Sequence, residues 1–199
     1  MRCFVAIDLD EATRRAAERV CDRLRRAADS QAGARGLRWV DPALMHVTLR
    51  FLGETADSLL SEACSAVELA SRVTPPFRLR LTRVGAFPDE HAPRVLWIGL
   101  DDAARGCQRW LEAAEPAFER LGFAREPREL HPHVTLARSK SREGGQALRA
   151  ALDRARSAPT SADRATNADR TVDHVTLYES GLSPTGPRYA PLLVAPLTG

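Results

Sequence analysis

The chain has 199 residues, of which 44% are hydrophobic and 28% are charged, and its formal net charge is +3. This composition is typical of a globular protein with one sizeable core, and so small a net charge argues against a duplex-binding protein. The first apolar run is too brief for a signal peptide, and no other run approaches the roughly 20 residues that span a bilayer. We therefore expect a cytoplasmic protein with no membrane partner.

The length allows one domain over residues 1–199, or two small lobes that share one core, and hydrophobic periodicity predicts that strands and helices alternate. Asp10 is the expected N-cap of the first helix and Gly122 the expected stop of the third. Residues 157–170 carry almost no large apolar side chain and are interpreted as a mobile loop. The expected elements, in chain order, are a strand at 3–9, a helix at 11–28, strands at 37–40 and 45–52, a helix at 57–72, strands at 77–82 and 94–100, a helix at 103–121, a strand at 133–138, a helix at 143–156, and strands at 171–178 and 188–194.

The four cysteines are widely spaced in apolar surroundings and include no C-x-x-C pair. This spacing predicts buried free thiols and neither disulfides nor a zinc site. Of the 29 basic residues, all except Lys140 are arginine. Arginine suits bidentate contacts to phosphate, although the Ala- and Arg-rich helices also favour its use as a general surface cation.

The tetrapeptide His-Val-Thr-Leu occurs three times, beginning at His46, His133 and His174, in a chain that has only five histidines. A predicted helix begins about ten residues after His46 and again after His133, and a pair of strands follows each helix. We interpret this regularity as two halves of similar plan. No helix is expected after His174, so we interpret that residue as non-catalytic, with a contact to substrate in the cleft as the open alternative.

Residues i and i+2 of a strand project from the same face, so His46 points with Thr48 and His133 points with Thr135. If the two halves face each other, two imidazoles and two hydroxyls surround one small anion. Histidine titrates near neutral pH, so one copy can remove a proton while the other donates one, without a metal ion. Arg138 alternates away from His133 in an ideal strand, but at the strand end it could turn towards the anion.

Along nearly its whole length the chain resembles the two-histidine phosphoesterase superfamily, and in particular the LigT-like RNA 2′,3′-cyclic phosphodiesterases. The superfamily is defined by two H-x-[ST]-x motifs, which match the tetrapeptides at His46 and His133. The resemblance departs at His131, which stands before Pro132 in the second motif and is interpreted as a packing residue or an additional cation. The matching stretches are residues 1–7, Trp39 with 46–53, 93–97, 131–138, 177–180, Gly186 and Tyr189.

The resemblance implies a bilobal α+β fold with a pseudo-twofold axis, in which two antiparallel sheets flank a central cleft and the helices lie outside. It implies hydrolysis of a terminal 2′,3′-cyclic phosphate on RNA to a 2′-phosphate, with neither a metal nor another cofactor. His46 becomes the proton donor and His133 the proton acceptor, with Thr48, Thr135 and Arg138 as phosphate ligands. The expected partners are RNA or oligonucleotide ends, and we expect a monomer.

Other functions remain open at this point. The same site could act on 2′-5′-linked oligonucleotides or on a nucleotide-sugar cyclic phosphate. A metal-dependent hydrolase of the amidohydrolase type could use His131 and His133. Its barrel fold, however, needs more metal ligands and about 250 residues. A non-catalytic module that binds RNA ends would display stacking aromatics, whereas the few aromatic residues here lie mostly at core-like positions.

Overall fold

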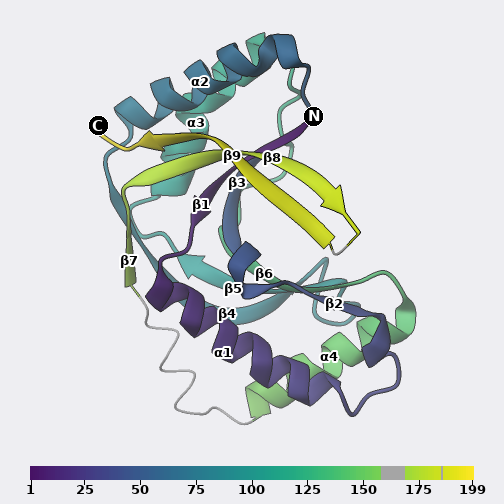
Figure 1. The fold of residues 1–199 in the computed structure, drawn as a ribbon. Coiled ribbons are helices and arrows are strands. Elements are labelled where there is room, and N and C mark those ends of the chain that lie inside the picture. Colours follow the sequence, from purple (N-terminus) through teal and green to yellow (C-terminus); the bar gives the residue numbers. More distant parts are fainter. Residues whose placement is uncertain (158–168, 185) are drawn as a thin grey trace.

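The computed structural model describes residues 1–157, 169–184 and 186–199, and it shows mixed helices and strands (Figure 1). The helices are α1 (Glu11–Ala28), α2 (Leu60–Val73), α3 (Gly106–Arg120) and α4 (Arg142–Ser157). The strands are β1 (Arg2–Asp8), β2 (Leu37–Trp39), β3 (His46–Glu54), β4 (Phe77–Phe87), β5 (Val95–Asp101), β6 (His133–Ser139), β7 (Asp169–Val172), β8 (His174–Ser183) and β9 (Gly186–Pro196).

Local capping signals explain where the helices begin and end. The Asp10 carboxylate accepts a hydrogen bond from the Thr13 backbone N–H at 2.8 Å, which confirms the predicted N-cap of α1. Gly122 has a φ of 88° directly after α3, which confirms the predicted stop. The helix expected from residue 103 begins later, at Gly106, because the Asp102 carboxylate accepts from the Gly106 N–H at 2.7 Å.

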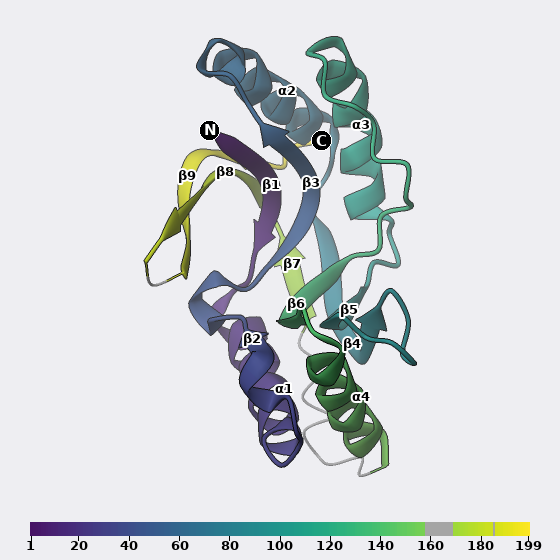
Figure 2. The same ribbon diagram turned by 90° about the vertical axis from the view of Figure 1, so that its right-hand side faces the viewer.

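The strands form one curled antiparallel sheet in the order β7-β4-β5-β6-β3-β1-β8-β9, with β2 also paired to β6. The two predicted sheets are the two halves of this path, β7-β4-β5-β6 and β3-β1-β8-β9. The halves meet where β3 and β6 pair at a single position, Val47 opposite Val134. Beyond it the two motif strands diverge, and Figure 2 shows the sheet curling between the two groups of helices.

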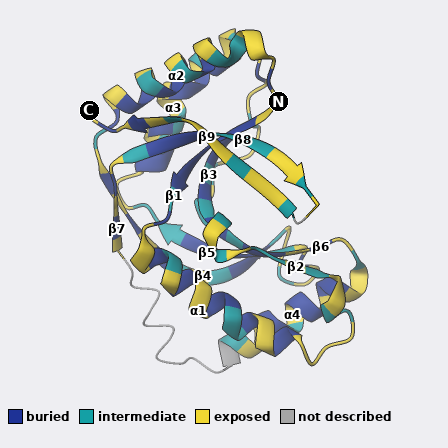
Figure 3. Ribbon diagram, in the orientation of Figure 1, coloured by how far each residue is buried: buried dark blue, intermediate teal, exposed yellow. Residues whose placement is uncertain are grey.

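The helices lie outside the sheet in two pairs, as predicted. α1 packs with α4 beside β6, and α2 packs with α3 against β3, β8 and β9. Figure 3 shows buried residues along β1 and β3 and on the inward side of the helices, whereas β9 is mostly exposed or intermediate. In α1 that side carries Val20, Cys21 and Leu24, which recur at helical spacing and are almost fully buried.

One predicted strand is wrong in its extent. The segment expected to run unbroken from 171 to 178 is interrupted at Asp173 and forms β7 and β8, which belong to opposite halves of the sheet path. The break arises because β7 pairs with β4 whereas β8 pairs with β1 and β9. Most of the loop predicted at 157–170 lies outside the described residues.

The four cysteines are free thiols, and Cys3, Cys21 and Cys107 are buried as expected, whereas Cys64 is partly exposed. Within the described ranges, none of the helices has the length and apolar character needed to cross a membrane.

Candidate active site

The two motif strands repeat the same pattern of burial. In β3 the side chains of His46 and Thr48 are half-buried while Val47 is fully buried, and β6 shows the same alternation from His133 to Thr135. Extending the antiparallel register by one residue on each side of Val47 and Val134 places His46 opposite Thr135 and Thr48 opposite His133. Both His/Thr pairs therefore share one face of the sheet, as the spacing predicts.

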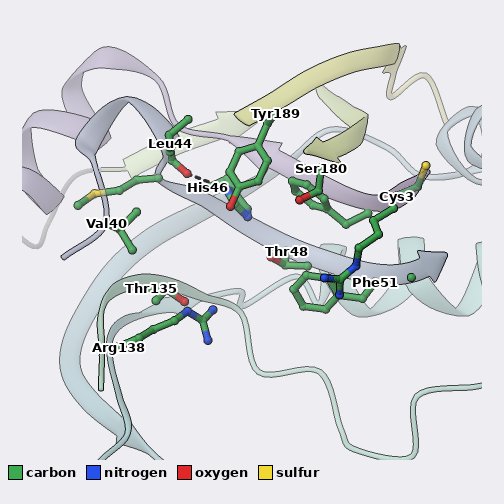
Figure 4. A pocket seen from close by; sticks show the side chains of 14 residues that line it. Cys3, Val40, Leu44, His46, Thr48, Phe51, Thr135, Arg138, Ser180 and Tyr189 are labelled. Atoms are coloured by element: carbon green, nitrogen blue, oxygen red, sulfur yellow. Dashed lines mark hydrogen bonds between the residues drawn. The ribbon is translucent and has the colours of Figure 1, made fainter. Parts of the chain in front are cut away.

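A pocket of about 220 Å³ opens where β3 and β6 diverge. Four of the five predicted site residues line it: His46, Thr48, Thr135 and Arg138. Figure 4 shows His46 and Thr48 on one side and Thr135 with Arg138 on the other. His133 does not line this pocket, but it stands two residues before Thr135 on the same face of β6.

A β-bulge directs Arg138 towards the pocket. Trp97 pairs with Thr135 and Leu96 pairs with Ala137, so Leu136 is an extra residue in β6. The extra residue reverses the alternation that would otherwise point Arg138 away from His133. In β3 the register skips Leu49 in the same way, and Phe51 lines the pocket at the position equivalent to Arg138.

The two imidazoles are oriented by the same hydrogen bond. His46 Nδ1 lies 2.8 Å from the Leu44 carbonyl oxygen, and His133 Nδ1 lies 2.6 Å from the His131 carbonyl oxygen. Because a carbonyl can only accept, each Nδ1 carries the hydrogen and donates it. The Nε2 atom of each ring is thereby left for chemistry.

Aromatic rings enclose both imidazoles. The His46 ring lies 5.0 Å from Phe4 and 5.3 Å from Tyr189, and the His133 ring lies 5.1 Å from Phe87, measured between ring centroids. Burial lowers the pKa of His46 below its ordinary value, although the Leu44 carbonyl and the Asp8 carboxylate oppose this effect. Burial also lowers the pKa of His133. Both rings are therefore poised to lose a proton readily.

The remaining predicted histidines have different surroundings. The exposed His131 ring packs against Trp97 with centroids 4.8 Å apart, which agrees with its interpretation as a packing residue. His174 does not line the pocket. Its Nδ1 lies 2.6 Å from Asp173 Oδ1, and its Nε2 lies 3.8 Å from Asp8 Oδ2.

Phe4, Tyr189 and Asp8 are neighbours of His46 that the sequence reasoning did not single out as functional. Phe4 and Asp8 belong to β1, which was predicted as a buried strand with no attention to its two faces. Period-two alternation along residues 4, 6 and 8 would have placed both on the face that His46 shares. Among the described residues, no group of three or more His, Cys, Asp or Glu side chains is arranged to hold a metal ion.

The sequence profile of the LigT-like phosphoesterases matches the chain twice, over residues 9–97 and 98–189, and each match contains one motif strand. An RNA 2′,3′-cyclic phosphodiesterase of Methanothermobacter thermautotrophicus is 30% identical over 196 residues, which cover 98% of this chain and 97% of that protein. One from Aeropyrum pernix is 38% identical over 112 residues, which cover 56% of this chain and 62% of that protein.

Solved structures show the same relationship. The crystal structure of a Thermus thermophilus protein has a TM-score of 0.78 and 28% identity, and the alignment covers all of this chain and 99% of that one. E. coli LigT, crystallised with 3′-AMP, has a TM-score of 0.67 and 26% identity, and the alignment covers 100% of this chain and 98% of that one. The double profile match and the full-length relatives lead to one conclusion: the chain belongs to the LigT-like phosphoesterase family.

Proposed function

We propose that this protein hydrolyses the terminal 2′,3′-cyclic phosphate of RNA to a 2′-phosphate without a metal ion. The observation that carries the proposal is the convergence of His46 and Thr48 from β3 with Thr135 and Arg138 from β6 on one pocket. Relatives that are named RNA 2′,3′-cyclic phosphodiesterases and align over nearly the full length support the same reaction. The substrate is an RNA or oligonucleotide end, and the protein acts as a monomer in the cytoplasm.

The reaction needs one base and one acid on opposite sides of the phosphorus atom. His133 Nε2 takes a proton from a water molecule, whose oxygen forms a bond to phosphorus. The bond from phosphorus to the 3′-oxygen breaks, and His46 Nε2 donates a proton to that oxygen. Each proton transfer of this kind contributes about 10²–10⁴-fold to the rate.

Thr48, Thr135 and Arg138 stabilise the negative charge that develops on the non-bridging oxygens. The two threonine hydroxyls reach the anion from opposite strands, because β3 and β6 present them on one face. The guanidinium of Arg138 offers two parallel N–H donors to a phosphate. Donors fixed before the reaction act more strongly than water, which must reorient around the new charge.

The deciding experiment uses EDTA-treated protein and a short RNA that ends in a 2′,3′-cyclic phosphate. The expected product carries a 2′-phosphate, and its yield is unchanged when divalent metal is added back. His46→Ala and His133→Ala are each expected to reduce kcat at least about 10²-fold. His91→Ala is the matched control, because His91 lies in the turn between β4 and β5 with its side chain 87% exposed.

The remaining outcomes separate the alternatives. Turnover that requires added metal would favour a metal-dependent hydrolase. Cleavage of a 2′-5′-linked oligonucleotide or a nucleotide-sugar cyclic phosphate, with none of the RNA end, would keep the site and change the substrate. Tight binding of the RNA end without turnover would leave a non-catalytic RNA-binding module.

A further inference from the structure

The carboxylate of Asp8 breaks the similarity between the two halves of the site. Asp8 ends β1 and is the Cα partner of His46 in the ladder with β3. At the equivalent position in the other half, the Cα partner of His133 is Gly99 in β5. Residues directly opposite in an antiparallel pair have Cβ atoms about 4.5–5.5 Å apart on one face. A carboxylate thus lies opposite the first histidine, whereas the residue opposite the second histidine has no side chain.

Two hydroxyls on β8 hold the Asp8 carboxylate in place. Thr176 Oγ1 donates to Asp8 Oδ2 at 2.7 Å, and the Tyr178 hydroxyl donates to Asp8 Oδ1 at 2.5 Å. Thr176 is 1% exposed and belongs to the third His-Val-Thr-Leu tetrapeptide. Both hydroxyls therefore hold the carboxylate in one orientation. Burial, reinforced by Asp8, raises the pKa of Tyr178, so its hydroxyl remains a donor throughout the neutral range.

The third histidine lies on the far side of the same carboxylate. His174 Nε2 is 3.8 Å from Asp8 Oδ2, and Asp173 binds the other ring nitrogen. Asp8 therefore stands between two imidazoles on three neighbouring strands, with His46 on β3 and His174 on β8. The third tetrapeptide does not line the pocket. Its histidine and its threonine both contact the Asp8 carboxylate instead.

We propose that Asp8 is a positioning residue that stabilises the protonated form of His46 relative to that of His133 and thereby makes His46 the acid, while His133, which faces Gly99, becomes the base. This inference rests on the proposed function, because it assigns the two proton transfers of that reaction. His174 supports the arrangement from β8 by flanking the same carboxylate. Among the described residues, the other charged or titratable groups that act on Asp8 or His46 include Arg138 and His133 on β6, Tyr189 on β9, Tyr178 on β8 and Arg170 on β7.

Electrostatics agrees with the geometry. Asp8 raises the pKa of His46 against the effect of burial. For His133, the charged neighbours His131, Arg138 and His46 all lower the pKa. Arg138 lowers the pKa of both histidines, so the carboxylate of Asp8 is the charged group that distinguishes the surroundings of His46 from those of His133.

The test removes the charge of Asp8 while keeping its shape. In Asp8→Asn, ¹⁵N NMR titration of the histidines is expected to show that His46 loses its proton at a pH about one unit lower, while His133 changes less. The alkaline limb of the pH profile of kcat also moves to lower pH, so kcat at pH 8 falls about tenfold with little change in KM. Asp8→Glu keeps the charge and is expected to retain the wild-type limb.

The matched control is Asp101→Asn, because Asp101 ends β5 as Asp8 ends β1 and pairs only with the partly exposed Arg80 among the described residues. Neither the titration of His46 nor kcat should change in this variant. An unchanged His46 titration in Asp8→Asn, or an equal shift at His133, would overturn the inference. If the enzyme proves inactive on the cyclic phosphate, the proposed function fails, yet the NMR titration still decides the role of Asp8. A thermal melt identifies a misfolded variant, and Asp8→Ser then supplies a second neutral replacement.

Discussion

Val47 and Val134 face each other at the one position where the two halves of the sheet pair among the described residues. Both side chains are fully buried, so this contact holds the two motif strands together while His46, Thr48 and Thr135 beside it line the pocket. Because β3 and β6 diverge beyond it, space opens between the two His/Thr pairs. Each half contributes one of these strands, which explains why two similar motifs contribute to one site.

Arg138 is the residue whose placement depends on the bulge in β6, and its replacement tests that placement. Arg138→Ala is expected to lower kcat about 10²–10³-fold, the usual loss when one fixed donor to a developing anion is removed. Arg138→Lys should recover only part of this loss, because lysine keeps the charge without the planar pair of donors. Steady-state kinetics on the RNA cyclic phosphate measures both.

The control for Arg138 is Arg19→Ala, which removes an exposed arginine from α1 without touching the pocket. Its kinetics should match the unmodified protein. A loss in Arg138→Ala confined to KM would contradict the expectation, since it would show that the guanidinium binds substrate and transition state equally.

The lowered pKa values of the two histidines predict an acidic optimum for kcat/KM. In the proposed mechanism the active form has His46 protonated and His133 neutral, and burial lowers the pKa of both below 6.5 in the free protein. As the pH falls from 8, His46 gains its proton and kcat/KM rises until His133 is also protonated. The bound phosphate anion favours the protonated form, so the optimum of kcat should lie at higher pH. A maximum of kcat/KM above pH 7.5 would contradict this prediction.

The same two groups link folding to pH. A histidine whose pKa is lower in the folded state binds its proton first in the unfolded chain, so its effect on stability is absent above pH 6.5 and destabilising below it. Denaturant unfolding should show that the free energy of unfolding decreases as the pH is lowered from 7.5 to 5. The double variant His46→Gln/His133→Gln should flatten that dependence.

The motifs and most elements could be predicted because their signals are local. The alternation at His46 and Thr48 depends only on neighbours in sequence, as does the N-cap at Asp10. The bulge at Leu136 could not be predicted, because it exists only through the register between β6 and β5. The same applies to Asp8, which becomes a neighbour of His46 and Thr176 through two long-range strand pairings.

A buried ion pair joins the first motif strand to α3, and its disruption should destabilise the protein strongly. Arg50 Nε and Nη2 lie 3.1 and 3.0 Å from the two carboxylate oxygens of Glu115, and both residues are about 5% exposed. Arg50 also donates to the Ala124 carbonyl oxygen at 2.6 Å. Glu115→Ala leaves a buried guanidinium without its counter-ion and should cost about 3–5 kcal/mol in the free energy of unfolding.

The control for this pair is Asp169→Ala, which removes the Arg78–Asp169 ion pair at the surface, where the side chains are 71% and 46% exposed. Its cost should stay within about 1 kcal/mol. Replacing both buried partners, as Arg50→Met/Glu115→Leu, should restore much of the stability lost in Glu115→Ala. Chemical denaturation of the three variants decides the prediction, and equal costs for the buried and exposed pairs would refute it.

Gly85 on β4 supports the surroundings of His133 through the indole of Trp97. A Cβ atom added at Gly85 would overlap Cη2 of Trp97, so the indole would have to move. That ring packs against His131, whose carbonyl orients His133, and its centroid lies 6.2 Å from that of His133. Gly85→Ala is therefore expected to cost about 1–3 kcal/mol in stability and to lower kcat by misplacing His133.

Two further variants isolate this contact. Gly181→Ala is the control, because its nearest neighbour is the Arg188 carbonyl oxygen at 3.9 Å, and its cost should stay within about 0.5 kcal/mol. Trp97→Phe in the Gly85→Ala background makes room for the added methyl group, so the double variant should be more stable and more active than Gly85→Ala alone. Because the two residues touch, their effects should couple rather than add. Strictly additive losses in stability and in kcat would show that Gly85 acts on the site by a route other than the indole.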